Sequence, residues 1–166
     1  MDVGFELYQA GKRFDRYKQL MKEIRKKYKK KLDRIFHPLH EEVFHEIDCL
    51  QCANCCKTTS PIFYENDIQR ASKALCMKVA EFTNAYLRID SDGDYVLKSL
   101  PCPFLGYDNK CIIYESRPTA CREYPHTNRK RMYQIGNLTL RNSLVCPTVA
   151  RIFNKLEEKD YNELLS

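Results

Sequence analysis

Apolar residues recur at alternating spacings of three and four along the first part of the chain. They are Phe14, Tyr17, Met21, Ile24, Tyr28 and Ile35, with Leu20, Leu32 and Phe36 widening the stripe. This spacing predicts one long amphipathic helix over residues 14–36, which Pro38 is expected to end. Lys31 falls where the repeat requires an apolar side chain, so packing across a domain is expected in place of a long coiled coil.

Two further segments have helical patterns. In the segment from about Asp67 to Leu87, one face carries Ile68, Ala71, Leu75, Val79, Phe82 and Tyr86. Asn66 or Asp67 is a suitable cap for its start. Cys76 lies inside this pattern and is expected to be a small packing residue. The segment from Pro147 to Glu158 is predicted to be a terminal helix with its proline in the first turn.

The segments between these helices favour short strands. Tyr95 to Leu100 alternates after the turn-forming run Asp90 to Asp94, and Cys111 to Tyr114 is expected to pair back as a hairpin strand. Met132 to Leu140 is predicted to be a strand or hairpin. The fold class is therefore α+β and mainly helical, with a long N-terminal helix, a terminal helix, a small β-hairpin and irregular cysteine loops.

The chain of 166 residues has the size of one domain with an appendage. We expect residues 1–45 to form a basic amphipathic helical segment and residues 46–166 to form a cysteine-cluster metal-binding domain. No apolar run approaches the roughly 18 residues that span a bilayer. Residues 1–30 are rich in Lys, Arg and Glu and lack an export signal, so a cytoplasmic location is expected.

The formal charge of +6 is unevenly distributed along the chain. Lys22 to Arg34 contains eight Lys and Arg residues, opposed by Glu23 and Asp33. Such a run can attract nucleic acid or anionic lipid. We favour a solvated helix face with at most weak, salt-sensitive binding to polyanions, because the apolar stripe is used in packing and no stacking platform for bases accompanies it. Nucleic-acid binding is possible but is not favoured.

Nine cysteines in a chain expected to stay in a reducing compartment favour metal ligands or catalytic thiols over disulfides. Four of them fall within eight residues, at Cys49, Cys52, Cys55 and Cys56. Gaps of two residues let one turn of backbone direct several sulfurs at one centre, as in zinc knuckles and iron–sulfur loops. Four more candidate ligands follow, at Cys102, Cys111, Cys121 and Cys146.

The adjacent pair Cys55 and Cys56 constrains the kind of centre. Neighbouring side chains in extended backbone point to opposite sides, so two centres or one multinuclear centre are easier to build than a single tetrahedral site. The eight thiolates would suffice for two four-coordinate sites. A redox dithiol at Cys49 and Cys52 is the alternative, but the thioredoxin-like context of a strand followed by a helix is not evident.

Other side chains have candidate roles beside the thiolates. Arg117 and Arg122 are candidates to offset the negative charge of a thiolate-bound metal, or else to hydrogen-bond a nearby carboxylate. Four histidines are alternative ligands, at His37, His40, His45 and His126. We do not favour them, because the eight cysteines already meet the coordination demand.

Taken in order, the cysteine motifs resemble the YkgJ-like cysteine-cluster family of zinc- or iron-chelating domains. The resemblance covers roughly residues 49–150. It is carried by Cys49-x2-Cys52-x2-Cys55-Cys56, Cys102-Pro103-Phe104-Leu105, Cys111-Ile112-Ile113-Tyr114-Glu115-x-Arg117-Pro118, Cys121-Arg122-x-Tyr124-Pro125 and Cys146-Pro147. The first spacing is one residue shorter than the C-x3-C-x2-C-C expected of that family. The resemblance implies metal chelation by zinc or iron.

Three classes of function are compatible with these observations. A metal-binding structural or carrier module is favoured. The resemblance also admits an iron–sulfur redox or protein-modifying enzyme, since similar cysteine segments accompany flagellin lysine methylases, but no glycine-rich loop of the dinucleotide type is present. A basic nucleic-acid adaptor is the third. The sequence specifies neither a protein partner nor a substrate.

Overall fold

The computed structural model describes residues 2–159. Its contacts divide the chain into two compact units. Residues up to Asp48 and from Pro125 onward form the first, called here the helical unit, and residues 49–124 form the second, called the cysteine unit. The predicted division into a basic helical segment, residues 1–45, and a metal-binding domain, residues 46–166, stays a prediction. The mainly helical α+β class is confirmed.

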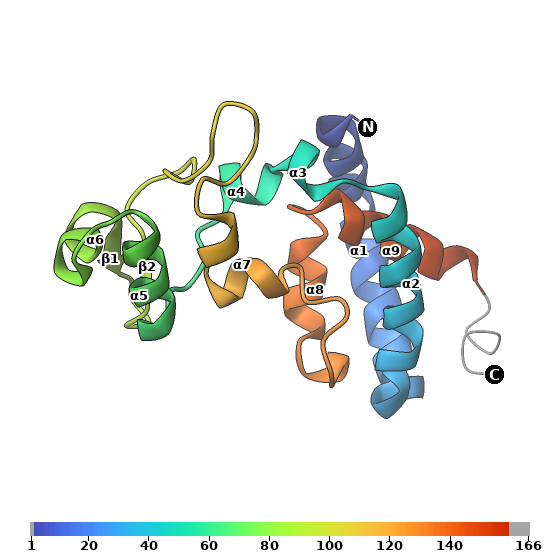
Figure 1. The fold of residues 1–166 in the computed structure, drawn as a ribbon. Coiled ribbons are helices and arrows are strands. Elements are labelled where there is room, and N and C mark those ends of the chain that lie inside the picture. Colours follow the sequence, from blue (N-terminus) through green and yellow to red (C-terminus); the bar gives the residue numbers. More distant parts are fainter. Residues whose placement is uncertain (1, 160–166) are drawn as a thin grey trace. The chain divides into compact units, whose positions relative to one another are not determined.

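The helical unit is built from two antiparallel N-terminal helices and a C-terminal helix that contacts both of them (Figure 1). The elements are α1 (Val3–Tyr28), η1 (Lys29–Lys31), α2 (Leu32–Glu46), η3 (Met132–Gln134), α8 (Gly136–Asn142) and α9 (Pro147–Glu158). The predicted bounds of the terminal helix are confirmed. Among the helices of the described residues, none combines the length and the apolar character needed to cross a bilayer.

The N-terminal helix differs from its prediction in two ways. It is interrupted at Lys29–Lys31, where the chain reverses so that apolar residues before and after the turn face one core. Pro38 does not end the helix but lies inside α2. An internal proline costs about 3 kcal/mol, and the burial of Leu39 and Val43 beyond it offsets that cost.

Aromatic side chains hold the three long helices together. The ring of Phe153 in α9 stacks on Tyr17 of α1 at 4.9 Å between centroids and meets Phe36 of α2 edge-on at 6.3 Å. All three are buried, and such ring pairs add to the free energy gained by burial alone. The hydroxyl of Tyr17 donates to Asn154 Oδ1 at 2.6 Å, so the one polar group of this cluster is satisfied.

Asp2 caps α1, because its Oδ1 accepts from the Phe5 N–H at 3.0 Å. We expect Asp2→Ala to lower the free energy of unfolding by about 1 kcal/mol, since the variant leaves a helix-terminal donor without this acceptor. Urea unfolding followed by circular dichroism measures the change. Asp2→Asn keeps the acceptor and should be nearly neutral; an equal loss in both variants would contradict the capping role.

The predicted strand or hairpin over residues 132–140 is wrong, since this segment forms η3 and the start of α8. Thr139 and Leu140 are buried beside α1 in a helical conformation. Gly136 permits the close approach, because a Cβ there would lie 3.0 Å from Arg25 Cδ. Packing against α1 therefore overrides the strand-like alternation.

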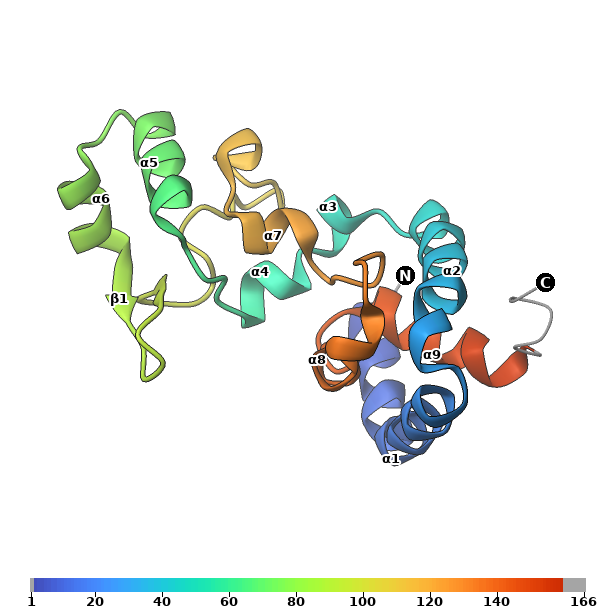
Figure 2. The ribbon, with the colours of Figure 1, turned by 90° about the horizontal axis from the view of Figure 1, so that it is seen from below.

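The cysteine unit contains short helices and one two-stranded sheet (Figure 2). Its elements are α3 (Cys49–Cys52), α4 (Asn54–Thr58), α5 (Glu65–Ala74), α6 (Val79–Tyr86), β1 (Leu87–Ile89), β2 (Tyr95–Leu97), η2 (Tyr114–Ser116) and α7 (Thr119–Glu123). β1 and β2 are antiparallel, with Arg88 opposite Val96. Phe82 of α6 belongs to one buried cluster with Leu87 and Leu97 of this sheet, and it stacks on Phe104 at 5.7 Å.

Three details of this unit correct the sequence predictions. The strand at 95–97 pairs with 87–89 across the Asp-rich turn, whereas Cys111 makes only an isolated bridge to Leu105. The predicted helix over 67–87 is split, because the chain turns between α5 and α6. Cys76 lies in that turn with φ of 55° and is exposed, so it is not a packing residue.

Candidate metal centre

The first cysteine motif occupies two short helical turns separated by a left-handed residue. Cys49 and Cys52 lie in α3, and Cys55 and Cys56 lie in α4. Ala53 between them has φ of 48° and ψ of 15°, a conformation that is uncommon outside glycine and ends one helical turn before the next begins. The four thiols therefore do not share one continuous helix face.

A backbone hydrogen bond joins this motif to the next cysteine in the chain. The Cys102 N–H donates to the Cys56 carbonyl at 2.8 Å. Beyond Cys102 the chain folds back on itself, because Leu105 and Cys111 form an antiparallel bridge and the Gly106 N–H donates to the Lys110 carbonyl at 2.7 Å. Cys56, Cys102 and Cys111 are thus brought into one region although up to 55 residues separate them.

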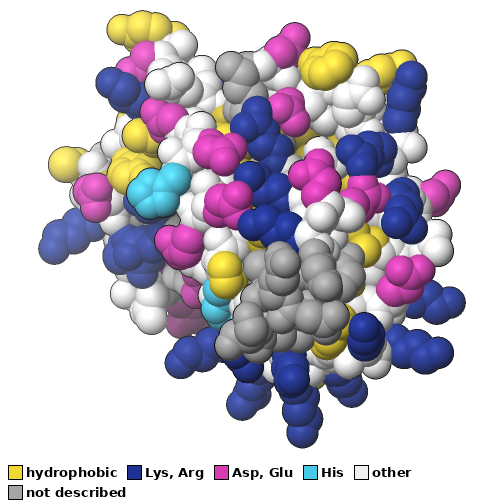
Figure 3. Space-filling model, turned by 90° about the vertical axis from the view of Figure 1, so that its right-hand side faces the viewer, with side chains coloured by type: hydrophobic (Ala, Val, Ile, Leu, Met, Phe, Trp, Pro, Cys, Tyr) yellow, Lys and Arg dark blue, Asp and Glu magenta, His cyan; other side chains and the backbone are white. Residues whose placement is uncertain are grey.

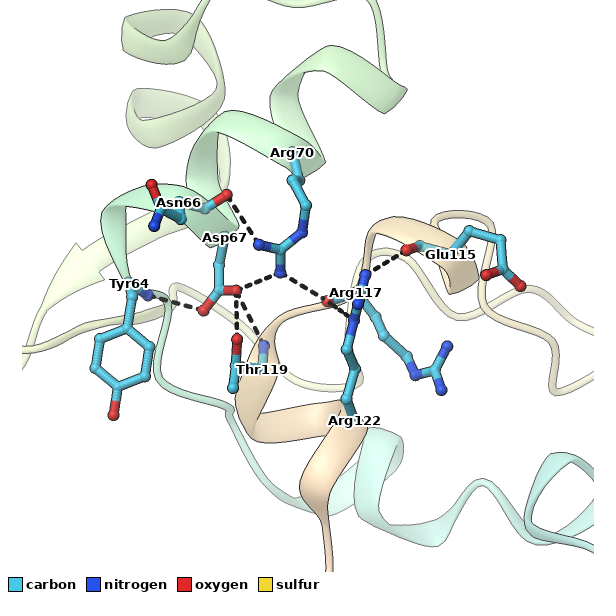
Figure 4. Close-up of polar contacts among 8 residues, drawn as sticks. All are labelled: Tyr64, Asn66, Asp67, Arg70, Glu115, Arg117, Thr119 and Arg122. Atoms are coloured by element: carbon cyan, nitrogen blue, oxygen red, sulfur yellow. Dashed lines mark hydrogen bonds and ion pairs between the residues drawn. The ribbon is translucent and has the colours of Figure 1, made fainter.

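The helix that carries Cys121 is held by a buried carboxylate of α5, Asp67, whose contact with Thr119 is drawn in Figure 4. Asp67 of α5 is 1% exposed, and its Oδ1 accepts from the N–H and the hydroxyl of Thr119 at 3.0 and 2.9 Å. Thr119 begins α7, which carries Cys121 two residues later. Asp67 therefore satisfies the first backbone donor of α7 from outside the helix, and it fixes the end of the helix that holds the cysteine.

The same carboxylate closes the start of its own helix and binds an arginine. Its Oδ2 accepts from the Tyr64 N–H at 3.1 Å, and its Oδ1 accepts from Arg70 at 2.5 Å. Burial acts to raise the pKa of Asp67, but the hydrogen bonds from Tyr64, Thr119 and Arg70 outweigh it and hold that pKa below its usual value. The predicted cap at Asn66 or Asp67 is thus displaced to Tyr64, with Asp67 reaching back to it.

Arg117 and Arg122 shape the segment between Cys111 and Cys121. Arg122 donates to the carbonyls of Arg117 at 3.1 Å and Glu115 at 2.5 Å, which closes the loop before α7. Arg117 donates to the Tyr114 carbonyl at 2.6 Å and lies over the Tyr114 ring at 3.7 Å. The positive charge of Arg117 acts to lower the pKa of Cys111 and Cys121, and the role predicted for Arg117 and Arg122 beside a thiolate-bound metal stays a prediction.

Four thiols act on one another through their charges. Burial, together with negative charge on Cys56, Cys102 and Cys111, raises the pKa of Cys121 to about 12. Burial likewise raises the pKa of Cys102 to about 11, with contributions in the same direction from Cys56 and Cys111. For Cys111, burial and the charge of Cys56 again raise the pKa. These effects agree with the backbone contacts that bring Cys56, Cys102 and Cys111 into one region, and the convergence of the eight cysteines stays a prediction.

Cys56 differs from the other three thiols. A hydrogen bond from the Cys55 thiol lowers the pKa of Cys56 to about 7, against the effect of burial and with help from the charge of Lys57. Cys56 is therefore the thiol of this group that ionises most readily, and the thiolate is the form that binds metals. Its negative charge acts on each of the other three.

The structure relates the remaining predicted ligands to these four in different ways. Cys55 is hydrogen-bonded to Cys56, while Cys49 and Cys52 precede them in α3. Cys146 lies in the helical unit, directly before α9. Within residues 2–159, no three His, Cys, Asp or Glu side chains are arranged so as to hold a metal ion. The eight-cysteine ligand set therefore stays a prediction.

The histidines have other contacts. His37 Nε2 lies 3.0 Å from the Arg129 carbonyl, and His40 Nδ1 lies 2.7 Å from the Thr127 hydroxyl. The His40 ring also stacks on Phe44 at 4.2 Å between centroids. These contacts place both side chains within the helical unit.

Sequence reasoning missed the link from Asp67 to Thr119. Asp67 was identified as a candidate cap for its own helix, which is a local role. The contact with Thr119 spans 52 residues, and nothing in either segment alone specifies it. The one available signal was a carboxylate on the apolar face of a helix, which requires a partner when it is buried.

A family model described as "CxxCxxCC: Putative zinc- or iron-chelating domain" matches residues 48–147. Its pattern has the spacing of Cys49, Cys52, Cys55 and Cys56, so the one-residue departure expected from the resemblance is wrong. No curated protein and no solved structure matches the chain. The matched range contains all eight predicted ligands and the Asp67 contact.

Proposed function

Because the chain belongs to the CxxCxxCC family of zinc- or iron-chelating domains, we propose that it binds zinc or an iron–sulfur centre through clustered cysteine thiolates. The principal ligands that we propose for this centre are Cys56, Cys102, Cys111 and Cys121. Cys49, Cys52, Cys55 and Cys146 complete the candidate set. The observation that carries the proposal is the backbone contact of Cys102 with Cys56 and the fold-back at Cys111, which bring thiols that are distant in sequence into one region.

The donor set fits such a centre chemically. Thiolates are soft ligands that suit zinc and iron–sulfur clusters. Four of them close together repel one another when ionised, and a bound cation supplies the positive charge that stabilises them. Four thiolates on one zinc leave a net charge of about −2, and Arg117 lies where its charge acts on two of these thiols.

The proposed role is that of a structural or carrier module. The helices that bear the clustered cysteines, α3, α4 and α7, contain only four or five residues each. Helices of this length are not stable by themselves. A metal that joins their thiols would therefore contribute directly to the folding of the cysteine unit, as structural zinc does in small domains.

Metal analysis of anaerobically purified protein, combined with visible absorption, tests this proposal. We expect zinc in a colourless protein, or iron and inorganic sulfide in a coloured one, at one or two centres per chain. Cys76→Ser serves as the control, because that side chain is exposed and lies away from the motifs. A protein that contains no tightly bound metal, and that takes up neither zinc nor iron when reconstituted, would refute it.

A further inference from the structure

A groove of about 450 Å³ lies on the helical unit between α1 and α8. It is lined by Lys18, Met21, Lys22, Arg25, Lys26, Lys29, Asn137 and Leu140. Five of these eight side chains are cationic, and within the part of the chain that the structure describes no acidic side chain lines the groove. This site is separate from the cysteines, all but one of which belong to the other unit.

The cations of the groove have no acidic partner among the described residues. Within residues 2–159 of the helical unit, ion pairs are made by other cations, among them Arg13, Arg16, Arg151, Lys155 and Lys159. Arg25 makes only a 3.5 Å contact with Asn137 Oδ1, and Lys29 lies 5.8 Å from the centre of the Tyr133 ring. Both contacts leave the positive charge uncompensated.

Two acids close in sequence to the groove cations, Glu23 and Asp33, make other contacts. Glu23 accepts from Gln19 Nε2 at 2.9 Å. Asp33 accepts from the backbone N–H groups of Arg131 and Met132, both at 2.7 Å. The positive field extends beyond the groove, because Lys and Arg side chains crowd the end of the helical unit where α1 passes into α2, at the lower edge of Figure 3.

The spacing of the cations suits a ligand with several linked negative charges. Lys18, Lys22 and Lys26 follow one another at intervals of four, which places them in a row about 6 Å apart on one side of the helix. Like charges at this spacing destabilise a helix. An anion that spans two or three of them would relieve this repulsion, whereas a single carboxylate would not.

We propose that this groove binds a compact ligand that carries linked phosphate groups, the class to which inorganic polyphosphates and nucleoside polyphosphates belong. Its volume lies in the range of small-molecule sites. Lysine ammonium groups bind phosphate as point charges. Met21 and Leu140 are the apolar side chains that line it, and they can contact the rest of a nucleoside polyphosphate. The sequence alone indicated that the basic segment Lys22 to Arg34 is a solvated helix face. In the structure, four cations of that segment line one groove.

Calorimetric titration of the full chain with inorganic tripolyphosphate and with ATP, at 150 mM salt, tests the proposal. The triple variant Lys22→Gln, Arg25→Gln, Lys26→Gln should bind at least tenfold more weakly. The matched control Lys12→Gln, Lys73→Gln, Arg88→Gln removes the same charge at exposed positions outside the groove and should change affinity by less than twofold. An equal loss of affinity in both triple variants would show that binding depends on net charge alone, and it would overturn the proposal.

A second variant tests the groove without altering its charge. Asn137 is exposed at the groove, and Asn137→Tyr should fill it and weaken tripolyphosphate binding at least tenfold, while thermal melting stays near that of the unchanged protein. Undiminished binding would overturn the proposal. So would tighter binding of a single-stranded oligonucleotide, or of vesicles of phosphatidylglycerol and phosphatidylcholine, that tripolyphosphate does not displace. Equal affinity for tripolyphosphate and ATP assigns recognition to the phosphates; tighter ATP binding adds the nucleoside.

Discussion

Replacing Cys121 by serine is expected to lower metal affinity by more than about 100-fold, since loss of an outer partner of a ligand already costs 10–100-fold. The serine hydroxyl is a poor ligand for metals that prefer thiolates. Cys121 is also the thiol on which the charges of Cys56, Cys102 and Cys111 all act. Metal stoichiometry by mass spectrometry and competition with a chelator measure the loss.

The same variant should lose stability that depends on the metal. Metal binding contributes on the order of 10 kcal/mol in structural zinc peptides, so a chelator should lower the unfolding midpoint of the unchanged protein but leave that of Cys121→Ser almost where it is. Cys52→Ser is expected to behave in the same way. Cys76→Ser is the matched control and should keep both metal and midpoint.

Full metal occupancy and unchanged unfolding in Cys121→Ser and Cys52→Ser would contradict the proposal that these cysteines bind the metal.

Cys146→Ser tests whether Cys146, which belongs to the helical unit, is also a ligand. Metal loss in that variant would show that the centre draws a ligand from both units. Retention would limit the ligand set to residues 49–121.

Asp67→Asn is expected to lower the free energy of unfolding of the cysteine unit by roughly 2–4 kcal/mol, because it breaks a buried, charged hydrogen-bond network. The variant amide keeps the shape of the side chain, but its NH₂ group would face the donors of Tyr64, Arg70 or Thr119. Urea unfolding monitored at both units measures the effect. Asp92→Asn, at an exposed position in the turn between the strands, is the control and should be nearly neutral.

The stability that Asp67 contributes is expected to be lost as the pH falls. The folded-state pKa of Asp67 lies below the usual value, so its contribution is complete above the unfolded-state pKa of about 3.9 and is lost as the pH falls through the lower folded-state pKa. Asp67→Asn should therefore remove a component of stability that the unchanged protein has at neutral pH and loses in acid. Parallel stability curves for the two proteins across this range would contradict the role of the carboxylate.

Stability and metal content can be separated in the same variant. Asp67 contacts α7 through Thr119 and does not touch a thiol in the described structure. Asp67→Asn should thus weaken metal binding less than Cys121→Ser does, and added zinc should recover part of the lost stability by mass action. A variant that loses stability but binds metal with unchanged affinity would assign Asp67 to folding alone.

The sequence by itself determined the features that depend on local pattern. The terminal helix begins and ends where proline and the apolar spacing predict, and the apolar stripe of the first segment is buried along α1 and α2. The family and its chelating chemistry also follow from the cysteine spacing. These properties are encoded within a few residues, so distant contacts are not needed to specify them.

Only the tertiary structure decided the features that join distant segments. Leu140 lies in a helix because α1 packs against it, and β2 pairs with Leu87–Ile89 and not with the predicted hairpin strand at Cys111 to Tyr114. The backbone hydrogen bond from Cys102 to Cys56, the anchoring of α7 by Asp67 and the groove lined by lysines have the same character. Burial and charge act between residues that neighbour one another in space, and a linear pattern cannot specify which segments those will be.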